Sequence, residues 1–252
     1  MLSKRIIPCL DIKDGRVVKG IRFNELRDAG DVVALAHRYY EEGADEIAML
    51  DITATVENRR TVAALIKEAA KSVFVPILAG GGVRTLSDFE MLLEAGADKV
   101  SINTAAVREP KILSDAAKLF GSQSVVLACD TRRKADGGYT VLVEGGKTDT
   151  GLELFAWLKE SIERGAGEIL LTSWDLDGTQ QGYDISLLKR VSERFPVPLI
   201  ASGGAGTAED IAAAFLEGKV DAALAASIFH FRKYTVKEVK QFLKNKGLEV
   251  RL

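Results

Sequence analysis

The chain has 252 residues, of which 47% are hydrophobic and 28% charged, and its formal net charge is −2. This length can bury a large core, and the near-neutral charge leaves no basic stripe, which argues against nucleic acid and anionic membranes as partners. No apolar run approaches the roughly 18 residues of a membrane span, and the first residues read as the lead into a short strand rather than a signal peptide, so we expect a cytoplasmic protein.

Cysteine and histidine are scarce. The sequence has Cys9, Cys129, His37 and His230, without the spacing of a metal site or of a disulfide framework. Strand alternation puts the two cysteines on opposite faces of a sheet, as core residues. We therefore expect no metal and no cofactor.

Eight short apolar runs alternate with amphipathic stretches along the chain. The predicted strands lie near residues 5–11, 46–51, 76–80, 98–102, 124–130, 167–172, 198–202 and 221–225. Helices are predicted between them, including one that starts at Thr235 with the capping-box spacing to Glu238. Apolar strands separated by helices indicate a parallel sheet, and eight such units in about 250 residues match a (β/α)₈ TIM barrel. A doubly wound open sheet is the alternative.

One segment of the chain occurs twice. Residues 75–82 (VPILAGGG) return as residues 197–204 (VPLIASGG), 122 residues later, and Asp98 returns as Asp221, 123 residues later. A period near half the chain predicts two fused halves. We expect a single domain of residues 1–252, built from half-barrels of about 1–122 and 123–252.

Four turns in register follow the third, fourth, seventh and eighth predicted strands. They are Gly81-Gly82, Asn103-Thr104, Gly203-Gly204 and Ala226-Ser227. Bare backbone N–H groups in such turns can hold a phosphate, although glycine also serves plain tight turns. Two pairs of turns indicate a substrate with two phosphates.

Two aspartates end equivalent strands. Asp11 closes the first predicted strand and Asp130 the fifth, 119 residues later. Half-barrel symmetry would put them on opposite sides of one mouth, where they could act as general acid and base on a flat substrate. The alternative is that each caps the turn that follows it.

The loops break this symmetry. Residues 13–30 and 131–150 form long connections, which are candidate lids. Asp51 ends the second strand and could orient Lys19 or a substrate hydroxyl, or only cap its loop. Lys19 could close over an anion or be a solvated surface residue.

Four charged residues lie at or near strand starts: Arg5, Glu46, Lys99 and Glu168. Charges that point into a barrel floor must be mutually paired to be tolerated. They would form either a salt-bridged plug or a gate for a small molecule that enters from below.

Several motifs together resemble a known family. They are CLDIKDGRVVKG at 9–20, DITA at 51–54, GADKVSIN at 96–103, ASGGAG at 201–206 and AASIFHF at 225–231. Over essentially the whole chain, the sequence resembles the cyclase subunits of imidazole glycerol phosphate synthase, the HisF family. The resemblance implies a barrel enzyme of histidine biosynthesis that takes ammonia from a glutaminase subunit. With it, the enzyme converts a two-phosphate ribulosyl aminoimidazole carboxamide ribotide (PRFAR) to imidazole glycerol phosphate and an aminoimidazole carboxamide ribotide (AICAR).

The resemblance also implies roles for single residues. Asp11 would be the base, Asp130 the acid, and Lys19 the lysine of a mobile loop. One phosphate site would comprise Gly82, Asn103 and Thr104, and the other Asp177, Gly178, Ser202, Gly204, Ala226 and Ser227. The charged floor would be an ammonia gate, with the glutaminase docked on that N-terminal face and Asp98 among its contacts.

Some positions depart from the family pattern. Ile21 and Arg22 lie in the first long loop, and Trp174 and Leu176 flank Asp175 where smaller or polar residues are common. A bulky Trp174 could crowd the site. Two alternatives stay open: the sister barrel, an isomerase that rearranges a sugar without ammonia, and a catalytically impaired or engineered barrel that only binds phosphate or docks a glutaminase.

Overall fold

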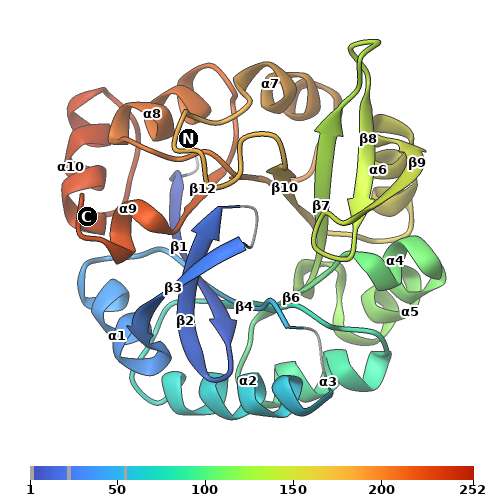
Figure 1. Cartoon of the computed structure of the whole chain (residues 1–252), viewed down its shortest axis with the longest axis horizontal. Helices are drawn as coiled ribbons and strands as arrows, with labels where there is room; N and C mark the ends of the chain where they lie inside the picture. Colours follow the sequence, from blue (N-terminus) through green and yellow to red (C-terminus); the bar gives the residue numbers. More distant parts are fainter. Residues whose placement is uncertain (1–2, 22–23, 54–55) are drawn as a thin grey trace.

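The computed structural model describes residues 3–21, 24–53 and 56–252. Its centre is a closed barrel of eight parallel strands (Figure 1). These strands are β1 (Arg5–Lys13), β4 (Ile47–Asp51), β5 (Ile77–Gly80), β6 (Lys99–Ile102), β7 (Val125–Arg133), β10 (Glu168–Ser173), β11 (Leu199–Ser202) and β12 (Ala222–Ala225). Each pairs with the next, β7 pairs with β10, and β12 closes the ring on β1. The eight predicted strands and the (β/α)₈ fold are confirmed.

Helices surround the barrel (Figure 1). They are α1 (Val32–Glu41), α2 (Val56–Ala69), α3 (Leu86–Glu94), α4 (Thr104–Arg108), α5 (Lys111–Phe120), α6 (Leu154–Glu163), α7 (Ile185–Arg194), α8 (Ala208–Leu216), α9 (Ser227–His230) and α10 (Val236–Asn245), with a 3₁₀ turn η1 at Ser122–Ser124. Helix α10 begins at the capping box of Thr235 and Glu238, as predicted. The cap satisfies backbone N–H groups that the first helical turn leaves without partners.

The two long connections are β-hairpins rather than loops. Strand β1 continues into β2 (Arg16–Ile21) and β3 (Asn24–Asp31), and β7 continues into β8 (Tyr139–Val143) and β9 (Thr148–Glu153). In Figure 1 the first hairpin crosses the centre of the barrel, and the tip between β7 and β8 extends past the ring of helices. The sequence predicted long connections at these positions, and the structure adds that β1 and β7 run on beyond their aspartates and pair with antiparallel strands.

The barrel sheet separates two apolar layers. Its interior is filled by a small cluster of mostly aliphatic side chains, among them Ile7, Cys9, Leu78 and Val126. A larger cluster, which includes Cys129, fills the space between the sheet and the helices. The two cysteines therefore lie on opposite faces, as strand alternation predicted.

Some backbone contacts recur at the spacing of the repeat. Capping boxes start α3 at Thr85 and α8 at Thr207, 122 residues apart. The Asp98 carboxylate accepts a hydrogen bond from Ile77 N at 2.8 Å, and Asp221 does the same for Leu199 N at 3.0 Å. Within the described ranges, the helices all fall short of the length and apolar character needed to cross a bilayer.

Candidate active site

A cavity of about 900 Å³ opens at the carboxyl ends of the barrel strands. Every predicted catalytic or substrate-binding residue except Lys19 lines it: Asp11, Asp51, Gly82, Asn103, Thr104, Asp130, Asp177, Gly178, Ser202, Gly204, Ala226 and Ser227. Lys19 lies in β2 opposite Arg27 of β3, and its side chain is outside the described part of the chain. Residues from strands along the whole chain thus converge on one site, at the face where barrel enzymes keep their chemistry.

The two predicted catalytic aspartates lie on opposite walls of this cavity. Asp11 is in β1 and Asp130 in β7, and three strands separate β1 from β7 in either direction round the barrel. Asp11 is almost fully buried, and the Cys9 thiol lies 3.5 Å from its Oδ1. A flat substrate between the walls would present a different face to each carboxyl group.

The pKa of Asp130 is raised above its usual value. Burial raises its pKa to about 7, and the charge of Asp177 adds to this, while hydrogen bonds from Thr172 and Asn103 oppose it. The Asn103 amide donates to Asp130 Oδ2 over 3.1 Å. A carboxyl group with this pKa carries a proton in a large fraction of molecules at neutral pH, as a general acid must.

Asp51 caps its own loop. Its Oδ1 accepts hydrogen bonds from Thr53 N at 2.8 Å and from Thr53 Oγ1 at 2.5 Å. A loop cap is one of the uses that the sequence left open, and the residue also lines the cavity. Because the cap fixes the carboxylate, Asp51 is a rigid part of the wall.

The glycine turns bring backbone close to backbone. Gly81 has φ 88°, and a Cβ atom there would lie 1.9 Å from the carbonyl oxygen of Asp51. Gly204 has φ 106°, and a Cβ atom there would lie 2.0 Å from the carbonyl oxygen of Gly182. Only glycine fits either position. The turns therefore serve tight packing, and their glycines also line the cavity.

The tip of the β8–β9 hairpin is tied to the turn before α4. Glu144 N donates to Thr104 Oγ1 over 3.0 Å, and the Glu144 carboxylate pairs with Arg108 at the end of α4. Since the Thr104 hydroxyl accepts from Glu144, its own proton is left to point elsewhere, including into the cavity.

Four cations on the cavity wall escaped the sequence interpretation: Lys13, Arg84, Arg108 and Lys147. Arg84 and Arg108 lie two and four residues beyond the Gly81-Gly82 and Asn103-Thr104 turns, and Lys13 and Lys147 lie in the two long connections. These positions are the signal that could have identified them. The cations offer local partners to an anionic substrate in a cavity that carboxylates also line.

The predicted floor cluster forms at the opposite end of the barrel. Arg5 bonds both Glu46, at 2.7 Å, and Glu168, and Lys99 bonds the same two carboxylates at 2.9 and 2.7 Å. Burial raises the pKa of Glu46, against the effect of Lys99. Burial alone would lower the pKa of Arg5, but the two carboxylates outweigh it and raise that pKa. The charges are mutually paired, as a barrel floor requires.

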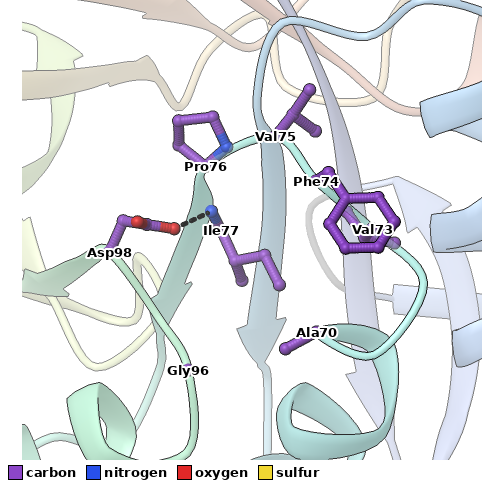
Figure 2. Close-up of a pocket in the computed structure, with 8 residues that line it drawn as sticks. All are labelled: Ala70, Val73, Phe74, Val75, Pro76, Ile77, Gly96 and Asp98. Carbon is purple, nitrogen blue, oxygen red and sulfur yellow. Dashed lines mark hydrogen bonds between the residues drawn. The ribbon is translucent and has the colours of Figure 1, made fainter.

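Asp98 lies on this same face, beside a shallow depression of about 300 Å³. Its carboxylate clamps Ile77 N at the start of β5 (Figure 2), a structural role that the sequence did not predict. Phe74, 74% exposed, lies on the rim of the depression. An exposed aromatic ring and a carboxylate at one depression give this face both an apolar and a charged feature.

No three histidine, cysteine, aspartate or glutamate side chains of residues 3–21, 24–53 and 56–252 converge as a metal site.

The family described as "Histidine biosynthesis protein" matches residues 5–235.

Three similar proteins all bear the name imidazole glycerol phosphate synthase subunit HisF. The relative from Wolinella succinogenes is 56% identical over 252 residues, covering 100% of this chain and 99% of its own. Those from Natranaerobius thermophilus and Alkaliphilus metalliredigens are 54% and 51% identical, over 100% of both chains in each comparison. The chain therefore belongs to the HisF family of imidazole glycerol phosphate synthase subunits, among the histidine biosynthesis proteins.

Proposed function

We propose that the chain is the cyclase of an imidazole glycerol phosphate synthase, which uses ammonia to convert PRFAR to imidazole glycerol phosphate and AICAR. The observation that carries the proposal is the arrangement of Asp11 and Asp130 on opposite walls of a cavity whose rim holds both pairs of phosphate turns. A substrate with a phosphate at each end fits such a cavity with its reacting centre between the two carboxyl groups.

The two aspartates divide the proton transfers. Asp11 acts as the base that takes a proton as ammonia adds to the ketone carbon of PRFAR and the new ring closes, while the ketone oxygen leaves as water. Asp130, whose pKa burial raises to about 7, gives its proton to the nitrogen of the departing fragment. Positioned acid–base groups of this kind contribute roughly 10²- to 10⁴-fold to a rate.

Phosphate recognition follows the repeat. Gly82, Asn103 and Thr104 would hold one phosphate. The second would lie against Asp177, Gly178, Ser202, Gly204, Ala226 and Ser227. Lys19 would close over the bound substrate. The support is that all the described members of both sets line one cavity.

Ammonia would enter through the floor. The ion-paired cluster of Arg5, Glu46, Lys99 and Glu168 closes the strand starts, and an apolar plug that includes Ala48 separates it from the cavity. We propose that this cluster is a gate: a neutral small molecule can pass an apolar interior, whereas its protonated form is excluded by the cost of desolvation.

The glutaminase partner would cover the floor face. We propose that Asp98 and the depression beside Phe74 belong to this interface (Figure 2). Ammonia released into such an enclosed interface would reach the gate without mixing with bulk water.

An assay of the purified chain with PRFAR, with and without ammonium salt, tests the function. We expect imidazole glycerol phosphate only when ammonia is present. Conversion of a ribotide at the same rate without ammonia would support the sister isomerase instead.

A further inference from the structure

Trp174 is the only aromatic side chain that lines the cavity among the residues that the structure describes. It lies directly after β10, and its backbone N–H donates to Thr131 O on β7 over 2.9 Å. Thr172, two residues earlier, pairs in register with Asp130 and hydrogen-bonds its carboxyl group. Trp174 continues the backbone pairing of β10 with β7 one residue beyond the strand, and its side chain lines the same cavity as Asp130, so it lies above Asp130 toward the mouth.

The hairpin tip holds the indole ring. A Cβ atom at Gly146 would lie 2.3 Å from Trp174 Cζ3 and 2.4 Å from both Cε3 and Cη2. The six-membered part of the ring is therefore packed against the bare backbone of Gly146. The same tip is anchored across the mouth by the contacts of Glu144 with Thr104 and Arg108. The ring is thus fixed by β10 on one side and by the hairpin on the other.

We propose that Trp174 is the platform against which the flat heteroaromatic ring of the substrate stacks. This inference rests on the proposed function. Asp130 protonates the nitrogen of the departing fragment, and that nitrogen is attached to the heteroaromatic ring. The ring must therefore lie near Asp130, where Trp174 supplies the one described aromatic surface of the cavity. Stacking on an indole favours any flat heteroaromatic ring and needs no hydrogen bonds.

Fluorescence tests the contact with the native residue in place. The chain has two tryptophans, and Trp157 is buried on α6 outside the barrel. In a Trp157→Phe variant all tryptophan emission comes from Trp174. We expect AICAR to quench it saturably, and ribose 5-phosphate, which lacks the heteroaromatic ring, to leave it unchanged. Unchanged emission from a chain that binds AICAR by calorimetry would overturn the proposal, and the unmodified chain with both tryptophans serves as a check on the variant.

Kinetics test the energetic role. We expect Trp174→Leu to raise KM for PRFAR by about 10-fold, and Trp174→Phe, which keeps an aromatic surface, to stay within about twofold of the unmodified chain. Trp157→Phe is the matched control and leaves KM unchanged. Equal KM values for the Leu and Phe variants at position 174 would contradict stacking.

A substitution at Gly146 tests whether this residue supports the indole ring of Trp174. Gly146→Ala displaces the indole, so we expect it to raise KM in the unmodified chain but to add nothing in a Trp174→Leu background. Additive effects would show that the glycine acts independently of the ring. If the unmodified chain does not convert PRFAR with ammonia, the proposed function fails, whereas an active chain with an unchanged KM in Trp174→Leu sinks only this inference.

Discussion

At the scale of single residues, Asp130 sets the pH dependence. Its pKa of about 7 means that it loses its proton near neutrality. If its protonated form is the acid, kcat at saturating free ammonia falls as pH rises above about 7. Thr172→Val removes a hydrogen bond that lowers this pKa, so the descending limb of the kcat profile moves to higher pH. A limb that stays in place, or moves down, contradicts the assignment.

The same group affects stability. The folded-state pKa of Asp130 is above its usual value near 3.8 because of burial, so the folded chain holds this proton more tightly than the unfolded chain. Ionisation therefore costs stability, starting near pH 4 and complete above about pH 7. We expect Asp130→Asn, which cannot ionise, to raise Tm by at least about 2 °C at pH 8 and to have little effect at pH 4. Calorimetric melts at both pH values check this, and a Tm gain of equal size at both pH values would argue against it.

The positions of these residues were easier to predict than their environments. Asp11 and Asp130 could be recognised as strand-end carboxylates in each half. The hydrogen bonds of Asn103 and Thr172 that tune Asp130 could not, because they depend on the register of β7 against β6 and β10. Asp98 shows the same limit: its clamp on Ile77 N joins neighbouring strands that the chain visits 21 residues apart.

At the scale of elements, the repeat predicts that equivalent helix caps contribute equally to the free energy of unfolding. Thr85 caps α3 and Thr207 caps α8, each in a capping box three residues before an aspartate. We expect Thr85→Ala and Thr207→Ala to lower the free energy of unfolding by about 1 kcal/mol each. Urea titration measures the loss. Thr235→Ala, in the capping box of α10 outside the repeated segment, is the comparison. A difference of more than about 2 kcal/mol between the first two variants would be inconsistent with equivalent elements.

Hydrophobic periodicity predicted the barrel strands because each is short, apolar and buried on both faces. The strands β2, β3 and β9 were not predicted, since they carry charge and glycine, a composition typical of loops. Only their pairing makes them strands: β2 pairs with β1 and β3, and β9 pairs with β8. Local sequence does not contain that information.

At the scale of the whole molecule, we propose that the barrel comprises two homologous halves, about 1–122 and 123–252. The support is the recurrence of the turns, caps and strand clamps after 122 or 123 residues. The halves differ at Asp51 and at the charged floor, which have no complete counterpart in the other half. The symmetric features would bind the two phosphates, and the asymmetric ones would admit ammonia from one end only.

The proposed gate can be tested by comparing turnover with two sources of ammonia, glutamine and added ammonium salt. Lys99→Met leaves Glu46 and Glu168 with one cation between them, Arg5. We expect a loss of roughly 3 kcal/mol in stability, because a buried carboxylate loses its partner. We also expect a lower ratio of glutamine-driven to ammonium-driven turnover, since added ammonium salt can supply the cavity through its open mouth. An unchanged ratio in a folded variant would count against a gate.

The partner face has a similarly direct test. Phe74→Asp places a charge beside the depression and, because Phe74 is 74% exposed, costs the barrel little. We expect it to weaken glutaminase binding by at least about 10-fold in a titration of the two subunits. Phe231→Asp is the control, since Phe231 is 53% exposed and follows α9 at the cavity end of the barrel. Equal weakening by both variants would speak against this interface.

We propose above all that Asp11 and Asp130 work as a base and an acid on one substrate held between them. Single-turnover conversion of PRFAR with saturating ammonia by the Asp11→Asn and Asp130→Asn variants tests this proposal. We expect each variant to bind PRFAR with nearly unchanged affinity yet to lose roughly 10²- to 10⁴-fold in rate. A variant of either aspartate that binds and converts the substrate at the rate of the unmodified chain would contradict it.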